Sequence, residues 1–82
     1  MTSPEQIKTW IDQSTLACEH VDVRGDGHHF EAVIVSPAFR GKSRVQQHQL
    51  VYAALGNRMA GEIHALSMQT FTPEDWAAQR RS

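Results

Sequence analysis

Apolar residues recur with helical spacing in two long stretches of the chain, and a third, shorter stretch is anchored by a tryptophan. A period of about 3.6 residues places such positions on one face, which is typical of a helix that packs on a core. We expect helices over about residues 4–16, 43–58 and 73–80. Their core positions are Ile7, Trp10 and Ile11 in the first, Val51, Ala54, Leu55 and Met59 in the second, and Trp76 in the third.

Each expected helix begins with the same short pattern. The segments SPEQ at 3–6, SRVQ at 43–46 and TPED at 72–75 place a hydroxyl residue three positions before Gln or Asp. This pattern is typical of a capping box, in which the hydroxyl accepts a hydrogen bond from the first turn of the helix. In two of the three segments a proline follows the hydroxyl residue at the first helical position, which further favours a helix start there. The segment SPAF at 36–39 predicts an additional single turn, which Gly41 interrupts.

Between the helices, alternating apolar and polar residues predict a hairpin and a third strand. The dipeptide Asp26-Gly27 favours a two-residue turn, which would place Gly25 opposite His28. The third strand is expected over about residues 62–70. In this register the cross-strand pairs are Val23 with Phe30 and Val21 with Ala32 on the core face, and Asp22 with Glu31 on a solvated face.

The order of these elements indicates an α+β fold of the form αββαβ(α). The connection from the second strand to the third contains a helix, which favours a parallel crossover. We therefore expect a three-stranded mixed sheet with helices on one face, similar to a type II KH domain. Residues 1–82 are expected to form a single domain, because the chain has 82 residues and no segment that resembles a linker.

Composition narrows the classes of function. The formal net charge is −1, so the chain has no overall basic field for nucleic acid. No apolar run reaches membrane-spanning length, and the N-terminus lacks the features of a signal peptide. One cysteine excludes an internal disulfide, so we expect a reducing cytoplasm. Cys18 is interpreted as a small core residue. No combination of residues indicates a catalytic site, and we expect a non-enzymatic protein.

Histidines supply the main candidate chemistry. Two of them, His20 on the outer face of the first strand and His48 beside several glutamines of the long helix, are interpreted as polar surface residues. His28 and His29 follow the expected turn and point to opposite sides of the hairpin, while His64 lies near the start of the third strand. Parallel pairing of the second and third strands would bring all three toward one rim of the sheet. They are either polar surface residues or metal ligands, since neutral imidazole binds metals well. Two or three ligands are too few for a closed metal site, so the hypothesis is a site shared with a partner.

A second candidate site surrounds the start of the helix near residue 43. Arg40, Lys42 and Arg44 flank Ser43, and backbone N–H groups at a helix N-terminus attract anions. The alternative is a solvated loop with ordinary surface charges. Contact with nucleic acid or with an acidic partner is the functional interpretation, although the segment has no interleaved aromatic residues for base stacking.

Residues 20–76 resemble the BolA family, and within it the IbaG-like branch. The motifs that carry the resemblance are F-x-G-K-S-R-V-Q-Q-H-Q-L-V-Y-A-A-L from residue 39, I-H-A-L-S-M-Q-T from residue 63 and T-P-E-D-W from residue 72. The resemblance implies the αββαβ core described above. It also implies a partnership with monothiol glutaredoxins around a bridging [2Fe-2S] cluster, to which the glutaredoxin contributes its cysteine and a glutathione thiolate.

The same resemblance assigns candidate ligands. The family's C-terminal histidine corresponds to His64, and its second ligand lies in the loop between the first two strands. Here that loop offers His28 and His29; the His29-Phe30 pair recurs in the family and favours His29. The isolated protein is expected to hold no cluster. The family is also linked to DNA binding and transcription, which is the alternative function here, and a homodimer is a further option.

Overall fold

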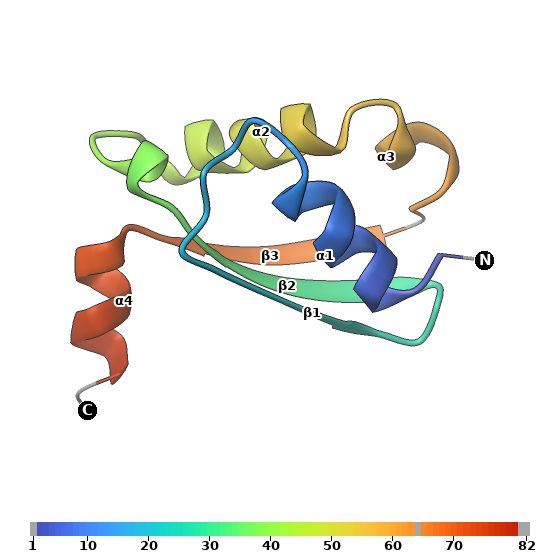
Figure 1. Cartoon of the computed structure of the whole chain (residues 1–82), viewed down its shortest axis with the longest axis horizontal. Helices are drawn as coiled ribbons and strands as arrows, with labels where there is room; N and C mark the ends of the chain where they lie inside the picture. Colours follow the sequence, from blue (N-terminus) through green and yellow to red (C-terminus); the bar gives the residue numbers. More distant parts are fainter. Residues whose placement is uncertain (1, 64, 81–82) are drawn as a thin grey trace.

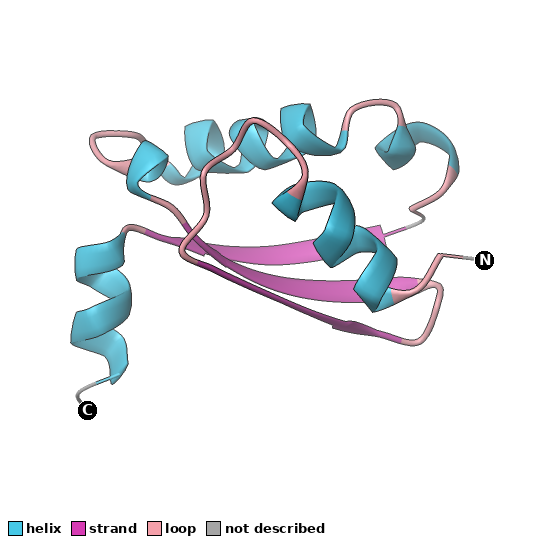
Figure 2. Ribbon diagram, in the orientation of Figure 1, coloured by secondary structure: helices cyan, strands magenta, loops and turns pink. Residues whose placement is uncertain are grey.

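The computed structural model describes residues 2–63 and 65–80, and His64 therefore lies outside the described residues. Figure 1 shows a sheet with helices packed above it and one helix at its end. Figure 2 separates the helices, strands and loops by colour. The elements in chain order are α1 (Pro4–Asp12), β1 (His20–Gly25), β2 (His29–Val35), the 3-10 turn η1 (Pro37–Phe39), α2 (Arg44–Leu55), α3 (Arg58–Gly61), β3 (Ala65–Phe71) and α4 (Pro73–Arg80).

The predicted helix starts are confirmed by their hydrogen bonds. The Ser3 hydroxyl accepts a bond from the backbone N–H of Gln6, and Ser43 and Gln46 form a reciprocal capping box. The Thr72 hydroxyl accepts from the backbone N–H of Asp75, at 3.1 Å. The single turn predicted after β2 is also present, because the Ser36 hydroxyl caps η1. These local contacts satisfy donors that a helix start otherwise leaves unpaired.

The sheet has the predicted mixed topology. β2 is central, pairs antiparallel with β1 and pairs parallel with β3. Helix α2 lies in the connection from β2 to β3, as the crossover argument requires. In the parallel pair, His29 is opposite Ala65 and Val35 is opposite Phe71. The hairpin tip and the start of β3 consequently lie at the same end of the sheet.

The predicted hairpin register is wrong by two residues. Gly25 is opposite Phe30 instead of His28, and Arg24 is opposite Glu31. The loop is longer than a two-residue turn because the Asp26 carboxylate accepts hydrogen bonds from the backbone N–H groups of both residues that follow Gly27. A shift of two residues leaves every side chain on its predicted face. It also places the cationic Arg24, instead of the acidic Asp22, opposite Glu31.

Three predicted boundaries also differ from the structure. The first helix ends at Asp12, not near residue 16, and β3 begins at Ala65 instead of residue 62. The predicted helix over 43–58 is divided into α2 and α3 at Gly56, whose φ angle is 62°. This left-handed backbone conformation suits glycine and ends a helix.

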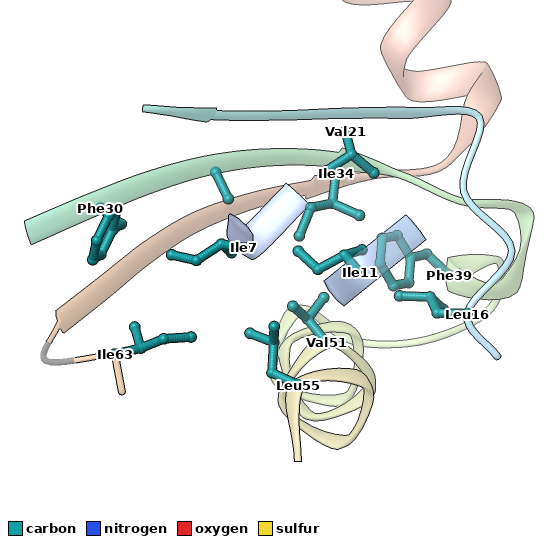
Figure 3. Close-up of a cluster of buried hydrophobic side chains, with 11 residues drawn as sticks. Ile7, Ile11, Leu16, Val21, Phe30, Ile34, Phe39, Val51, Leu55 and Ile63 are labelled. Atoms are coloured by element: carbon teal, nitrogen blue, oxygen red, sulfur yellow. The ribbon is translucent and has the colours of Figure 1, made fainter. Parts of the chain in front are cut away.

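The core lies between the sheet and the helices α1 and α2 (Figure 3). Each strand contributes one face, and each helix contributes the apolar stripe expected from its spacing. Ser36 is the buried polar residue among the described ones, and its hydroxyl donates to the Ala17 carbonyl oxygen. The buried apolar residues of this cluster are Ile7, Ile11, Leu16, Val21, Phe30, Ala32, Ile34, Phe39, Val51, Leu55 and Ile63.

Helix α4 packs at the end of the sheet where β3 ends, away from α1 (Figure 1). Its Trp76 stacks on His20 with 5.1 Å between ring centroids and contacts Phe71 at 5.3 Å. His20 was predicted to be a simple surface residue on the outer face; the structure gives it a packing role there. No helix in the described ranges has the length and apolar character needed to cross a membrane.

Candidate functional site

The hairpin tip is organised by Asp26. Its carboxylate oxygen Oδ1 accepts hydrogen bonds from the backbone N–H groups of His28 and His29, both at 2.9 Å. These bonds lower the pKa of Asp26, because hydrogen bonds to a carboxylate favour its ionised form. Gly27 adopts a φ of 100°, which a residue with a side chain adopts only with strain. The turn therefore holds the two histidines in a defined backbone arrangement.

Both turn histidines are exposed, and one of them is placed by the sheet. His29 is the first residue of β2, and its parallel neighbour on β3 is Ala65. His64, the third predicted ligand, directly precedes that neighbour in the chain and lies outside the described residues. The structure thus brings the turn histidines to the rim predicted from topology, with the start of β3 beside them.

The donor set at this rim is incomplete for a metal site. Within residues 2–63 and 65–80, no group of three or more His, Cys, Asp or Glu side chains is placed to hold a metal ion. Cys18 precedes β1 and is therefore at the other end of the sheet, roughly 20 Å from the hairpin tip at ~3.3 Å per strand residue. Burial raises the pKa of its thiol, and the nearby Asp12 carboxylate raises it further. The possible metal ligands at this rim are therefore imidazole nitrogens, and the cysteine thiol of the chain is too far away to join them.

A cavity of about 440 Å³ opens beside the hairpin tip. The Thr2 hydroxyl closes one side of it by donating to the Glu62 carbonyl oxygen at 2.7 Å. The Trp10 ring forms another part of its wall and carries the Arg58 guanidinium carbon 4.6 Å from its centroid. This cavity is lined by Thr2, Gln6, Trp10, Gly27, His28, Gly61 and Glu62. Sequence spacing did not predict it, because its walls come from three segments that are far apart in the sequence.

The predicted basic site is only partly available. Arg40 forms a bidentate contact with Glu74 on α4, with bonds of 2.8 Å and 2.6 Å. The Ser43 hydroxyl is used as the cap of α2. Lys42 and Arg44 are exposed and form no ion pair within the described ranges. Of the four predicted residues, Lys42 and Arg44 thus have charges that remain available to bind a partner.

His48 differs from its predicted role as an ordinary surface residue. It is half-buried on α2, and its Nε2 atom is fully buried with no hydrogen-bond partner in the described part of the chain. Nearby on the same helix, Val45 and Tyr52 leave 66% and 41% of their surface exposed. Helix α2 therefore buries the Nε2 atom of His48 and leaves two large apolar side chains exposed to solvent.

Comparison with known proteins gives a consistent result. The family model described as BolA-like protein matches residues 3–75. A Haemophilus influenzae protein named DNA-binding transcriptional regulator BolA is 43% identical over 63 residues, which are 77% of this chain and 61% of that protein. The Escherichia coli acid stress protein IbaG is 41% identical over 69 residues, covering 83% of this chain and 82% of its own length.

A solved structure supports the same relationship. A BolA protein homologue from Coxiella burnetii aligns with a TM-score of 0.87 and 43% identity, covering 94% of this chain and 99% of that structure. The α+β fold of this chain is thus shared with a solved relative. The names of the Haemophilus influenzae and Escherichia coli relatives describe a regulator and a stress protein. On this evidence the chain belongs to the BolA-like protein family.

Proposed function

We propose that the protein is a non-enzymatic partner of a monothiol glutaredoxin and shares a bridging [2Fe-2S] cluster with it. Its role would lie in iron–sulfur cluster trafficking or in iron regulation. The observation that carries the proposal is the parallel pairing of His29 with Ala65, which places exposed imidazoles beside the start of β3. The choice of partner is supported by the resemblance to the BolA family, which implies a monothiol glutaredoxin.

The donor set supports a shared cluster better than a resident one. His29, with His28 as the alternative, and His64 would supply nitrogen ligands from this chain. A partner would supply the thiolates, because the single thiol of this chain lies far from the rim and burial disfavours its ionised form. A bound cluster would supply one-electron chemistry and transferable iron and sulfide, while this chain would orient its imidazoles through the Asp26 turn.

The test is assembly with defined components. The protein is mixed with a monothiol glutaredoxin, glutathione, ferrous iron and sulfide, and the visible circular dichroism is recorded. We expect a spectrum that differs from that of the glutaredoxin alone and a complex with one protein per glutaredoxin. The His28→Ala/His29→Ala double variant should lose that spectrum, whereas His20→Ala, at the opposite end of the sheet, should keep it. A stoichiometric cluster in this protein without glutaredoxin would contradict the shared site.

DNA binding is a second candidate that a specific observation favours. Lys42 and Arg44 are exposed cations at the N-terminus of α2, and one relative carries a DNA-binding name. Arg40 is less available because Glu74 binds it. If phosphate contacts dominate, duplex affinity should fall steeply as salt rises, and Lys42→Glu with Arg44→Glu should flatten that dependence. An affinity independent of salt would count against this function.

A further inference from the structure

The cavity beside the hairpin tip lies between three segments that meet at one end of the sheet. Figure 1 shows the start of α1, the tip of the β1–β2 hairpin and the segment after α3 together at that end. The lining includes Trp10 from α1, His28 from the hairpin and Glu62 from the end of α3. Its volume of about 440 Å³ falls within the range of roughly 300–1,000 Å³ that is usual for small-molecule sites. The cavity is therefore large enough for a small polar ligand.

Two opposite charges flank this cavity without neutralising each other. Arg58 begins α3 and Glu62 directly follows it, at a spacing of four residues that usually allows a helical ion pair. Within the described ranges these two side chains form no ion pair. The Arg58 guanidinium instead lies over the Trp10 ring and donates to the Leu55 carbonyl oxygen at 3.4 Å. Glu62 is exposed, so a negative charge and a positive charge are held apart beside the cavity.

The backbone of Glu62 is held on both sides. Its N–H donates to the Arg58 carbonyl oxygen at 2.9 Å, and its own carbonyl oxygen accepts from the Thr2 hydroxyl at 2.7 Å. The chain before α1 and the chain after α3 are thereby joined at the cavity. Gln6, in the first turn of α1, adds a side-chain amide to the lining, and an amide can both donate and accept hydrogen bonds. The lining therefore combines a carboxylate on a held backbone with a neutral hydrogen-bonding group.

This arrangement is complementary to the head group of an α-amino acid. Such a head group carries an ammonium and a carboxylate on the same carbon atom, and its net charge is zero. The ammonium would donate to the Glu62 carboxylate, while the carboxylate would face the Arg58 guanidinium and accept from the Gln6 amide. Hydrogen bonds between ionised groups are the short and strong ones in proteins. A simple anion would be repelled by Glu62 and a simple cation by Arg58, so the charges favour the zwitterion over either.

We infer that this cavity binds a zwitterionic α-amino acid head group, and that its occupant in the proposed cluster complex is the γ-glutamyl end of glutathione. The identity of the occupant rests on the proposed function, which brings glutathione to the neighbouring rim. His28 joins the two places, because it lines the cavity and is also a candidate ligand.

The chemical structure of glutathione suits this position. Its glutamyl residue is linked to cysteine through the γ-carboxyl group, so the α-ammonium and the α-carboxylate of that residue remain free. An extended residue spans ~3.5 Å, and the γ-glutamyl residue is the direct neighbour of the cysteine. A glutathione sulfur bound to a cluster at the rim would therefore leave the head group within reach of the adjoining cavity.

The direct test uses this protein alone and S-methylglutathione, whose blocked sulfur is not a thiolate ligand for iron. In a titration followed by nuclear magnetic resonance, the indole N–H signal of Trp10 and the amide signal of Gly61 should shift. The indole signal of Trp76, at the other end of the sheet, should stay unchanged. Glu62→Gln should weaken the affinity about tenfold, because a charge-assisted hydrogen bond is lost. Glu31→Gln, which removes an equal charge from the outer face of β2, is the matched control and should bind normally.

Two further ligands separate the possible sources of the head group. S-Methylcysteinylglycine lacks the γ-glutamyl residue and should not shift the Trp10 signal. Free glutamate carries the head group without the rest of the peptide and should bind more weakly than S-methylglutathione. Tighter binding of free glutamate would make a free amino acid the ligand and overturn the assignment to glutathione. No response of Trp10 to either head group, or an affinity that Glu62→Gln leaves unchanged, would refute the site.

This outcome is separate from that of the cluster assembly, because the titration contains neither iron nor glutaredoxin. A cluster that forms in the assembly, with no binding of S-methylglutathione here, would refute the cavity site and leave the proposed function standing. Binding here that is sensitive to Glu62→Gln, with no cluster in the assembly, would support the head-group site and refute the proposed function.

Discussion

His29 lies directly opposite Ala65 in the parallel pairing of β2 with β3. The two residues belong to segments separated by two helices and a 3-10 turn, yet the crossover places them at the same end of the sheet. The same end carries the hairpin tip, whose backbone is held by the Asp26 carboxylate. His29 is thus positioned both by its place in β2 and by the hydrogen-bonded turn that precedes it.

The ligand hypothesis predicts unequal effects of the three histidines. His64→Ala should abolish the bridged cluster, while His28→Ala and His29→Ala should each reduce it partially and the double variant should lose it. The reason is that two neighbouring imidazoles at the turn can replace each other. Visible circular dichroism of the reconstituted complex measures the cluster, and binding of apo-glutaredoxin measures docking separately. Loss of docking and cluster together in His64→Ala would contradict a ligand role.

Cys18 provides the matched control for that experiment. Its thiol is half-buried, lies at the other end of the sheet and has a raised pKa. Cys18→Ala should therefore leave the spectrum of the reconstituted complex unchanged. A blue or red shift of the visible bands in this variant would place a sulfur ligand of this chain at the cluster and overturn the assignment of nitrogen donors.

Asp26 should control the turn in a pH-dependent way. Its folded pKa is lowered, so its contribution to stability is present above the ordinary aspartate pKa of about 3.9 and is lost as pH falls through the lower folded value. Asp26→Ala should remove this dependence and accelerate amide exchange at His28 and His29. Asp22→Ala, which changes a neighbouring strand carboxylate, is the control. Equal exchange rates in the two variants would show that Asp26 does not hold the turn.

The sequence pattern predicted the faces of the strands more securely than their register. Alternation assigns Val23 and Phe30 to the core, but a shift of two residues preserves that assignment, so burial alone cannot choose between the two registers. The choice depends on two hydrogen bonds to the Asp26 carboxylate, which lengthen the loop. Similarly, periodicity continued through Gly56, although the backbone there leaves the helix.

For the candidate sites, too, the sequence predicted what depends on the order of the elements and missed what depends on tertiary contacts. The rim was predictable because it follows from topology, which the order of elements determines. The pairing of Arg40 with Glu74 joins residues 34 positions apart, and nothing local in either segment indicates it. The buried Nε2 of His48 is also a tertiary effect, since the neighbouring glutamines made this helix surface look solvated.

The ion pair between Arg40 and Glu74 should fasten α4 to the η1 turn. Glu74→Gln is expected to accelerate amide exchange in α4 with little change in global stability, because both side chains are exposed. Arg40 lowers the pKa of Glu74, so the contact persists above the ordinary glutamate pKa of about 4.3 and weakens as pH falls through the lower folded value. Asp75→Asn is the control; equal acceleration there would mean that the pair does not fasten α4.

Replacing His48 with an apolar residue should stabilise the protein. The buried Nε2 atom has no hydrogen-bond partner in the described part of the chain, and an unsatisfied buried polar atom costs about 1–3 kcal/mol. Because the side chain is only half-buried, we expect His48→Leu to raise the free energy of unfolding by about 1 kcal/mol, the lower end of that range. Urea denaturation measures this change as a higher midpoint with an unchanged slope.

The adjacent residue distinguishes removal of a buried polar atom from a general gain in apolar surface. Gln49 is exposed on the same helix, so Gln49→Leu should change stability by no more than about 0.5 kcal/mol. Both substitutions introduce leucine, which has a higher helix propensity than histidine and a similar one to glutamine. A stabilisation of His48→Leu that exceeds both the propensity difference and the Gln49→Leu value would identify the orphaned nitrogen as its cause. A destabilised His48→Leu protein would show that the imidazole is needed where it lies.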